Sequence, residues 1–67
     1  MIKLIVSDYG GKVIKIERAT WLEDAEKALK KWQKGNVVEV ETDDWDDFRD
    51  LKDDDVFKKV SVRYVGW

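Results

Sequence analysis

The sequence contains no cysteine, no histidine and no proline. Without cysteine there can be no disulfide, no thiolate nucleophile and no Cys-ligated zinc or iron–sulfur site. Without histidine there can be no imidazole base, no Ser-His-Asp triad and no His-ligated transition metal. These absences exclude most common catalytic and metal-binding sites, and we expect neither a cofactor nor a resident metal.

Long hydrophobic runs are also lacking. No apolar stretch reaches the roughly 18 residues of a membrane-spanning helix, and the apolar run within residues 1–6 is shorter than the ~7–15 residues of a signal-peptide core. We therefore expect a cytoplasmic protein that makes no contact with membranes. Charged residues make up 42% and hydrophobic residues 43% of the 67 positions, which indicates one small globular domain over residues 1–67.

Catalysis is not expected. The Ser and Thr hydroxyls have no histidine to act as their base. Paired carboxylates such as Asp44 and Asp47 can serve as acid and base only in a cleft that excludes water, and so short a chain offers little concave volume. The sequence therefore predicts a protein that is not an enzyme.

Four segments have the β-branched and aromatic composition of strands, namely residues 2–7, 13–18, 37–42 and 56–65. Gly10-Gly11 separates the first two segments, and glycine readily adopts the positive φ that a tight hairpin turn needs. The first two segments are therefore predicted to form a β-hairpin.

An amphipathic helix is predicted between the second and third strands. Thr20 and Glu23 have the spacing of a capping box, and Gly35 is a typical residue just beyond a helix end. The helix is expected to run over residues 21–34, with its apolar stripe formed by Leu22, Ala25, Leu29 and Trp32, widened by Trp21 and Ala28. With a short helix in the acidic segment, the chain reads ββαβ(α)β, an α+β domain with one amphipathic helix on one face of a four-stranded sheet.

This order of elements resembles the β-grasp, or ubiquitin-like, fold. The residues that carry the resemblance are Leu4-Ile5-Val6, Gly11-Lys12, Ile14-Lys15-Ile16-Glu17, the helix from Trp21, and Val60-Ser61-Val62-Arg63-Tyr64. The resemblance implies that the first and last strands are central, parallel neighbours. It also implies a core made of Leu4, Val6, Ile14, Ile16, Leu22, Ala25, Leu29, Trp32, Val38, Val40, Val60 and Val62.

The first hairpin and the helix are also similar to the immunoglobulin-binding domains of streptococcal protein G, through Lys3-Leu4-Ile5, Ala25-Glu26-Lys27 and Lys30. That resemblance implies Fc binding through Glu26, Lys27 and Lys30 and through an aromatic residue on the third strand. In this chain the apolar residues of that strand are Val37, Val38 and Val40, which disfavours Fc binding. The chain ends with Val65-Gly66-Trp67 instead of the Gly-Gly tail of conjugated modifiers, so conjugation is not expected. The fold hosts many functions, and the resemblance does not decide among them.

Residues 43–55 form an acidic segment with eight aspartates, Asp43, Asp44, Asp46, Asp47, Asp50, Asp53, Asp54 and Asp55. A calcium loop starting at Asp44 is disfavoured, because Phe48 and Arg49 occupy positions that need an oxygen ligand and a glycine. A second interpretation is mimicry of a nucleic-acid backbone, with Trp45 and Phe48 interleaved among the carboxylates. A third is a solvated connection in which Trp45, Phe48 and Leu51 cover the edge of the core.

Two other surfaces are candidates for contact with a partner. Trp45 and Trp67 occupy less constrained positions than Trp21 and Trp32, which are expected in the core, and tryptophan is enriched in binding hot spots. The sheet face away from the helix is expected to carry Ile5, Val13, Val37, Val65, Phe57 and Trp67 beside Lys3, Lys15, Glu39, Lys59 and Arg63. That face would serve as a dimer or partner surface, unless the acidic segment folds over it or its apolar residues are scattered.

Direct binding to nucleic acid is not expected. The lysines near the helix end share their exposed face with Glu23, Asp24 and Glu26, and the net charge of the chain is −2.

The sequence thus favours a macromolecule-binding module, an acidic inhibitor of the phage type that occupies a basic or nucleic-acid-binding surface on a protein partner. The predicted partner-binding residues are Asp43, Asp44, Trp45, Asp46, Asp47, Phe48, Asp50 and Trp67. One alternative is a computationally designed idealised domain, favoured by the missing Pro, Cys and His and by the Gly35-Asn36 helix stop, but disfavoured by the many aspartates and four tryptophans. Another is a self-associating structural protein, such as a homodimer, that uses the open sheet face.

Overall fold

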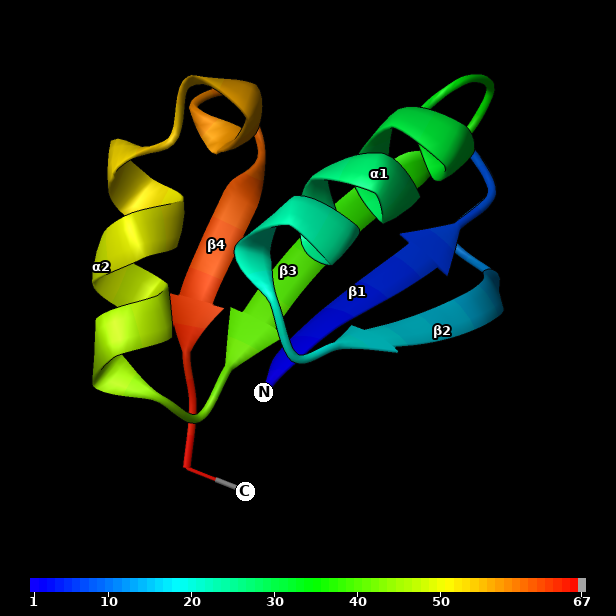
Figure 1. Ribbon diagram of the computed structural model, residues 1–67. Coiled ribbons are helices and arrows are strands. Elements are labelled where there is room, and N and C mark those ends of the chain that lie inside the picture. Colours follow the sequence, from blue (N-terminus) through cyan, green and yellow to red (C-terminus); the bar gives the residue numbers. More distant parts are fainter. Residues whose placement is uncertain (67) are drawn as a thin grey trace.

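In a computed structural model, which describes residues 1–66, the chain forms an α+β domain (Figure 1). The elements in chain order are β1 (Ile2–Ser7), β2 (Val13–Ala19), α1 (Leu22–Trp32), β3 (Val37–Thr42), α2 (Trp45–Asp53), the 3₁₀ helix η1 (Asp55–Phe57) and β4 (Ser61–Tyr64). The predicted fold class and order of elements are confirmed, including the short helix in the acidic segment.

The four strands form one mixed sheet in the order β2-β1-β3-β4. β1 lies between β2 and β3 and runs antiparallel to both, whereas β3 and β4 are parallel. The expectation that the first and last strands are neighbours is therefore wrong. β4 pairs with β3 at one edge of the sheet, because the chain crosses over from β3 to β4 through α2 and η1, as parallel neighbours require.

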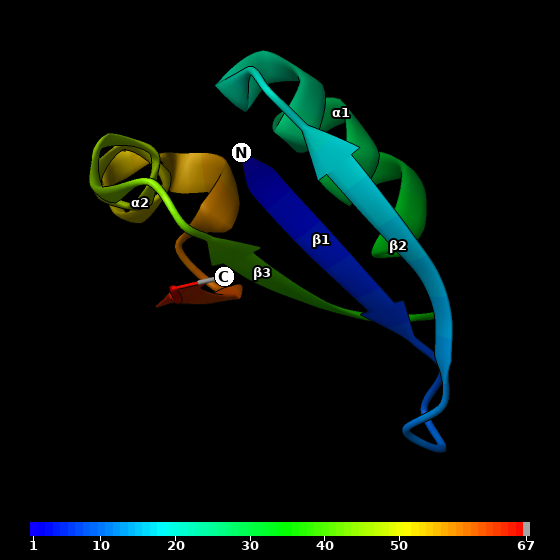
Figure 2. The ribbon, with the colours of Figure 1, turned by 90° about the horizontal axis from the view of Figure 1, so that it is seen from below.

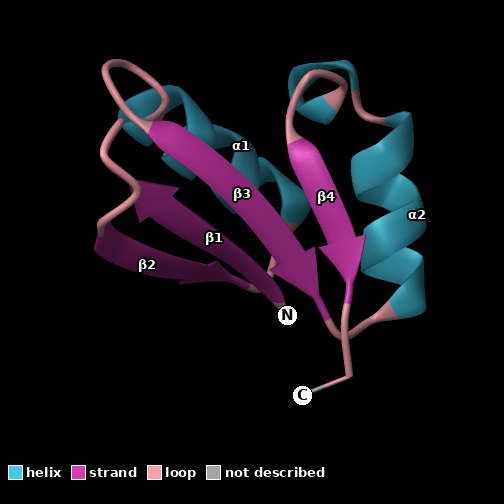
Figure 3. Ribbon diagram, turned by 180° about the vertical axis from the view of Figure 1, so that it is seen from behind, coloured by secondary structure: helices cyan, strands magenta, loops and turns pink. Residues whose placement is uncertain are grey.

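Both helices pack on the same face of the sheet (Figure 2), and within residues 1–66 no helix covers the opposite face. α1 lies over β1, β2 and β3, while α2 flanks β3 and β4 (Figure 3). The fully buried side chains between the layers include Ile2, Leu4, Leu29, Leu51 and Phe57. The acidic segment thus supplies Leu51 to the core and does not fold over the open face.

The predicted hairpin is present, and Asp8 organises its turn. The Oδ1 atom of Asp8 accepts hydrogen bonds from the backbone N–H groups of Gly10 and Lys12, both at 2.9 Å. Gly11 adopts φ +91°, a conformation that side chains with a Cβ rarely reach. The turn is therefore specified locally, by one carboxylate and one glycine.

Strand β2 differs from the prediction in the direction of its side chains. Leu4 pairs with Glu17 and Ile5 pairs with Ile16, and the register shifts between Val6 and Ser7. Because directly paired residues point to the same face, Lys15 and Glu17 lie on the helix side. Ile14 and Ile16, expected in the core, are 47% and 44% exposed.

The main helix also differs from its prediction at both ends. Its N-cap is Trp21, which makes no side-chain capping bond, so the predicted Thr20–Glu23 capping box does not form. The helix ends at Trp32, and the Nδ2 group of Asn36 donates to the Trp32 carbonyl at 3.0 Å. Gly35 does adopt a positive φ of 76°, as a residue beyond a helix end often does.

The last strand is shorter than predicted. Residues 56–65 were expected to be one strand, but η1 takes up part of that segment and β4 begins only at Ser61. Phe57, expected on the open face, is 1% exposed and belongs to the core. The side chain of Asp54 accepts from the backbone N–H of Val56 at 2.8 Å, and this cap favours a helical turn over an extended strand at that point.

Candidate functional site

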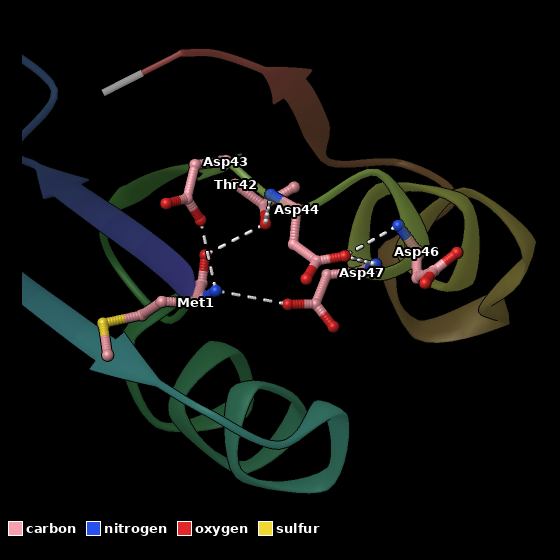
Figure 4. A network of polar contacts seen from close by, with 6 residues as sticks. All are labelled: Met1, Thr42, Asp43, Asp44, Asp46 and Asp47. Atoms are coloured by element: carbon pink, nitrogen blue, oxygen red, sulfur yellow. Dashed lines mark hydrogen bonds and ion pairs between the residues drawn. The ribbon is translucent and has the colours of Figure 1, made fainter.

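The acidic segment begins with a capped helix. Asp44 is the N-cap of α2, and its Oδ1 atom accepts from the backbone N–H groups of Asp46 at 2.8 Å and Asp47 at 3.2 Å (Figure 4). An N-cap carboxylate satisfies donors that have no partner within the helix and lies at the positive end of the helix dipole. Asp44 therefore has a structural role that accounts for its presence.

Two further aspartates hold the amino terminus of the chain. The ammonium of Met1 lies 3.2 Å from Oδ1 of Asp43 and 3.3 Å from Oδ2 of Asp47. Nearby, the buried Thr42 hydroxyl donates to the Met1 carbonyl at 2.9 Å and accepts from the Asp44 N–H at 3.2 Å (Figure 4). Desolvation lowers the pKa of the Met1 ammonium, but the hydrogen bonds and charges of Asp43 and Asp47 outweigh it, so the pKa is raised.

The other aspartates of the segment fall into two groups. Asp46 pairs with Arg49 at 2.8 Å and Asp55 pairs with Lys58 at 2.9 Å, while Asp54 caps η1. Asp50 and Asp53 lie exposed on α2. Capping and ion pairing thus explain much of the acidic cluster, and the carboxylates that α2 presents to solvent outside these pairs and caps are those of Asp50 and Asp53.

An aromatic patch, defined by Trp45, Phe48 and Tyr64, joins α2 to β4. The ring centroids of Trp45 and Phe48 lie 5.4 Å apart, and those of Phe48 and Tyr64 lie 6.0 Å apart. Trp45 meets Tyr64 edge to face at 5.4 Å and 86°. Trp45 is 57% and Tyr64 50% exposed, whereas Phe48 is half-buried against the core and has the Lys52 ammonium 5.8 Å from its ring centroid. Phe48 therefore anchors the patch in the core, and Trp45 and Tyr64 are its exposed rings.

The structure thus brings together two of the predicted contact residues, Trp45 and Phe48, with one that the sequence analysis missed. Tyr64 pairs with Thr42, a residue buried on the helix side, and therefore points toward α2. The sequence does show that Tyr64 carries a large ring and lies on the last predicted strand. It does not show which face of the sheet the ring occupies, because that depends on the register of β4. Trp67 lies outside the described residues.

The other two tryptophans were both expected in the core. Trp32 is half-buried, and its Nε1 group donates to Oε1 of Glu17 at 3.1 Å. Trp21 is 65% exposed, so its assignment to the core is wrong. The reason is that Trp21 precedes the first helical turn and does not share the stripe of Ala25 and Leu29.

The open face of the sheet carries both charged and apolar side chains. Arg63 on β4 lies 2.6 Å from Glu41 and 3.9 Å from Glu39 on β3, and Lys3 lies 3.8 Å from Glu41. Toward β2 the same face carries Ile5 and its partner Ile16, and also Arg18, which pairs with Lys3. Lys15, expected on this face, lies on the helix side because it pairs with the buried Val6.

Neither a pocket nor a group of three or more potential metal ligands is found within residues 1–66. No helix in that described part of the chain is both long and apolar enough to cross a bilayer. Comparisons with protein-family models, with curated proteins and with solved structures give no match.

Proposed function

We propose that this chain is a non-catalytic module that binds a protein partner through the aromatic patch and the acidic face of α2. The observation that carries the proposal is the exposure of Trp45 and Tyr64 in a cluster whose third ring, Phe48, is anchored in the core. Tryptophan and tyrosine dominate binding hot spots, because they bury a large area and lose little conformational freedom. Rings that already contact one another lose still less on binding.

The charge beside the patch favours a basic partner. Asp46, Asp50 and Asp53 have the spacing i, i+4, i+7 and therefore share one face of α2, where Arg49 offsets one of the three charges by pairing with Asp46. Carboxylates on that face would attract a lysine- and arginine-rich surface and speed association, while the aromatic rings supply most of the affinity. A surface of this chemistry suits the groove of a nucleic-acid-binding protein, which this module would occupy as an inhibitor.

The experiment is a quantitative pull-down with the immobilised chain and three variants. Trp45→Ala/Tyr64→Ala removes the two exposed rings, and Asp46→Asn/Asp50→Asn/Asp53→Asn removes the charge of the acidic face. Trp21→Ala is the matched control, because it deletes a tryptophan of similar exposure outside the patch. Circular dichroism checks that each variant folds.

The proposal predicts a protein that is recovered by the wild type and by Trp21→Ala, at least about tenfold less by the aromatic double variant, and less at high salt. Equal recovery by the wild type and the aromatic variant would overturn it. If the aromatic variant loses the protein but the triple Asn variant retains it, the patch binds but the preference for a basic partner is wrong.

A closer assignment to the β-grasp family also belongs to this proposal. The succession of hairpin, helix, strand, short helix and strand supports it. The pairing of β1 with β3, and not with β4, argues against it. The proposed binding function does not depend on that kinship, since it rests on the side chains of α2 and β4.

A further inference from the structure

The edge strand β2 is a second surface at which another chain could pair. It stands at the end of the sheet and pairs only with β1, so one side of its backbone has no partner strand in the described chain. Val13, Ile14 and Ile16 on this strand are each between 44% and 50% exposed. Folded proteins usually protect such edges, because an exposed apolar edge strand is a template for pairing with another chain.

The sequence of β2 is complementary to itself when two copies run antiparallel. If Ile16 of one copy lies opposite Ile16 of the other, then Lys15 lies opposite Glu17 and Glu17 opposite Lys15. Directly opposite residues in an antiparallel pair have Cβ atoms about 4.5–5.5 Å apart, so the pair of strands would carry two opposite-charge contacts and one apolar contact. We infer that the chain forms a homodimer by antiparallel pairing of β2 with β2 about a two-fold axis at Ile16.

Charge also excludes the nearest competing registers. In a dimer with a two-fold axis perpendicular to the sheet, paired residues must lie on the same face of the sheet. The nearest alternative registers therefore move the axis from Ile16 to one of its two neighbours, Lys15 or Glu17. An axis at Lys15 puts the two lysines opposite each other, and an axis at Glu17 does the same for the two glutamates. Both arrangements place like charges in contact, which is destabilising, and only the axis at Ile16 turns both charges into attractions.

The surroundings of β2 fit this pairing. Glu17 and Lys15 both lie on the helix side, and the Trp32 indole already fixes the Glu17 carboxylate there at 3.1 Å. On the open face Ile16 is paired with Ile5, so the dimer would align four isoleucines across four adjacent strands. The register shift beside Ile14 limits regular pairing to the stretch after it.

This contact is independent of the proposed partner-binding surface. The aromatic patch lies at the β4 edge and β2 forms the opposite edge of the sheet (Figure 1). A dimer through β2 would therefore leave two aromatic patches free, one at each end of an eight-stranded sheet.

Charge reversal tests the inference by sedimentation equilibrium over a range of protein concentrations. Lys15→Glu and Glu17→Lys each create two like-charge contacts across the axis, and each is expected to weaken dimerisation by about tenfold or more. The double variant Lys15→Glu/Glu17→Lys restores both attractions and should dimerise like the wild type. An equimolar mixture of the two single variants should form a heterodimer, because each contact then joins a lysine to a glutamate.

Circular dichroism separates loss of dimer from loss of fold, which matters because Glu17 accepts the Trp32 hydrogen bond. Lys15→Glu leaves that bond in place and serves as the primary variant. A wild type that stays monomeric at millimolar concentration would overturn the inference. So would a dimer that both single variants keep, since that result would indicate packing through the open sheet face.

Disulfide trapping gives an independent readout in a chain that has no cysteine of its own. Ile16→Cys places two sulfurs opposite each other at the axis, within the range that a disulfide spans, and should give a covalent dimer on mild oxidation. Ser61→Cys, exposed on the β4 edge, is the matched control and should stay largely monomeric. Equal or faster crosslinking through position 61 would contradict pairing through β2.

Discussion

The indole ring of Trp45 meets the phenol ring of Tyr64 edge to face, with centroids 5.4 Å apart and ring planes at 86°. The two residues come from α2 and β4, and the crossover between β3 and β4 brings them together. Both rings remain about half exposed, although aromatic rings in small domains are usually needed for the core. Two of the eight aromatic residues of the chain thus lie half exposed at the surface, in contact with each other.

Replacing Leu51 tests how α2 is attached to the sheet. Its side chain is fully buried in the core, and deleting buried leucine atoms leaves a cavity, so Leu51→Ala should lower the free energy of unfolding by about 2–5 kcal/mol. Urea denaturation measures this change. Asp50→Ala, at the exposed neighbouring position, should change it by no more than about 0.5 kcal/mol. Similar losses for both variants would show that α2 is not anchored by Leu51.

Two capping substitutions should have unequal effects. Asp44 accepts two backbone hydrogen bonds at the start of α2, and Asp44→Ala should destabilise the protein by about 1 kcal/mol. Thr20→Ala should have little effect, because α1 has no side-chain capping bond. Thermal denaturation of both variants measures the difference. A larger loss of stability for Thr20→Ala than for Asp44→Ala would support the capping box that the sequence predicts.

Glu26 should make stability depend on pH. A hydrogen bond to Asp54, desolvation and the charge of Asp54 raise the pKa of Glu26 above its ordinary value of 4.5. The folded state therefore keeps the Glu26 proton at pH values where the unfolded chain has released it. The resulting contribution to the free energy of unfolding is complete below pH 4.5 and is lost as pH rises through the folded pKa. Glu26→Gln should remove this part of the fall in the free energy of unfolding with rising pH, as measured by urea denaturation between pH 4 and 7. An unchanged pH profile in the variant would contradict the assignment.

The amino terminus should contribute to stability at neutral pH and not in strong alkali. Asp43 and Asp47 raise the pKa of the Met1 ammonium above its ordinary value of 8.0. Because the pKa of this ammonium is raised, its contribution to the free energy of unfolding is complete below pH 8.0 and is lost as pH rises through the folded pKa. Acetylation of the Met1 amine should lower the melting temperature at pH 7, and the difference from the unmodified chain should vanish at high pH. A difference that is the same at both pH values would argue against the ion pairs.

Local patterns in the sequence were enough to predict the order of elements. The alternation of residues 2–7, the Gly10-Gly11 turn and the stripe through Ala25 and Leu29 each depend on near neighbours in the chain, and all three appear in the structure. The short helix over the acidic segment follows in the same way from the spacing of its apolar residues.

The errors in strand order and in the faces of the strands concern features that depend on distant parts of the chain, whereas the capping box and the ends of α1 were wrong locally. The faces of Ile14 and Ile16 depend on the register of the hairpin, in which even-numbered residues of β1 pair with odd-numbered residues of β2, and a shift of one position exchanges the faces. The place of β4 beside β3, and with it the position of Tyr64, is set by the crossover and not by local composition. The candidate site was therefore only partly predictable, since one of its three rings comes from β4.

The most direct test of the proposed function is site-specific photo-crosslinking in cells. A photoreactive phenylalanine analogue at position 45 should give a discrete covalent adduct with one protein, because the aromatic patch lies in the interface. The same analogue at position 21, which is at least as exposed to solvent but lies outside the patch, should give no such adduct. Equal crosslinking from both positions, or no adduct from position 45, would contradict the account.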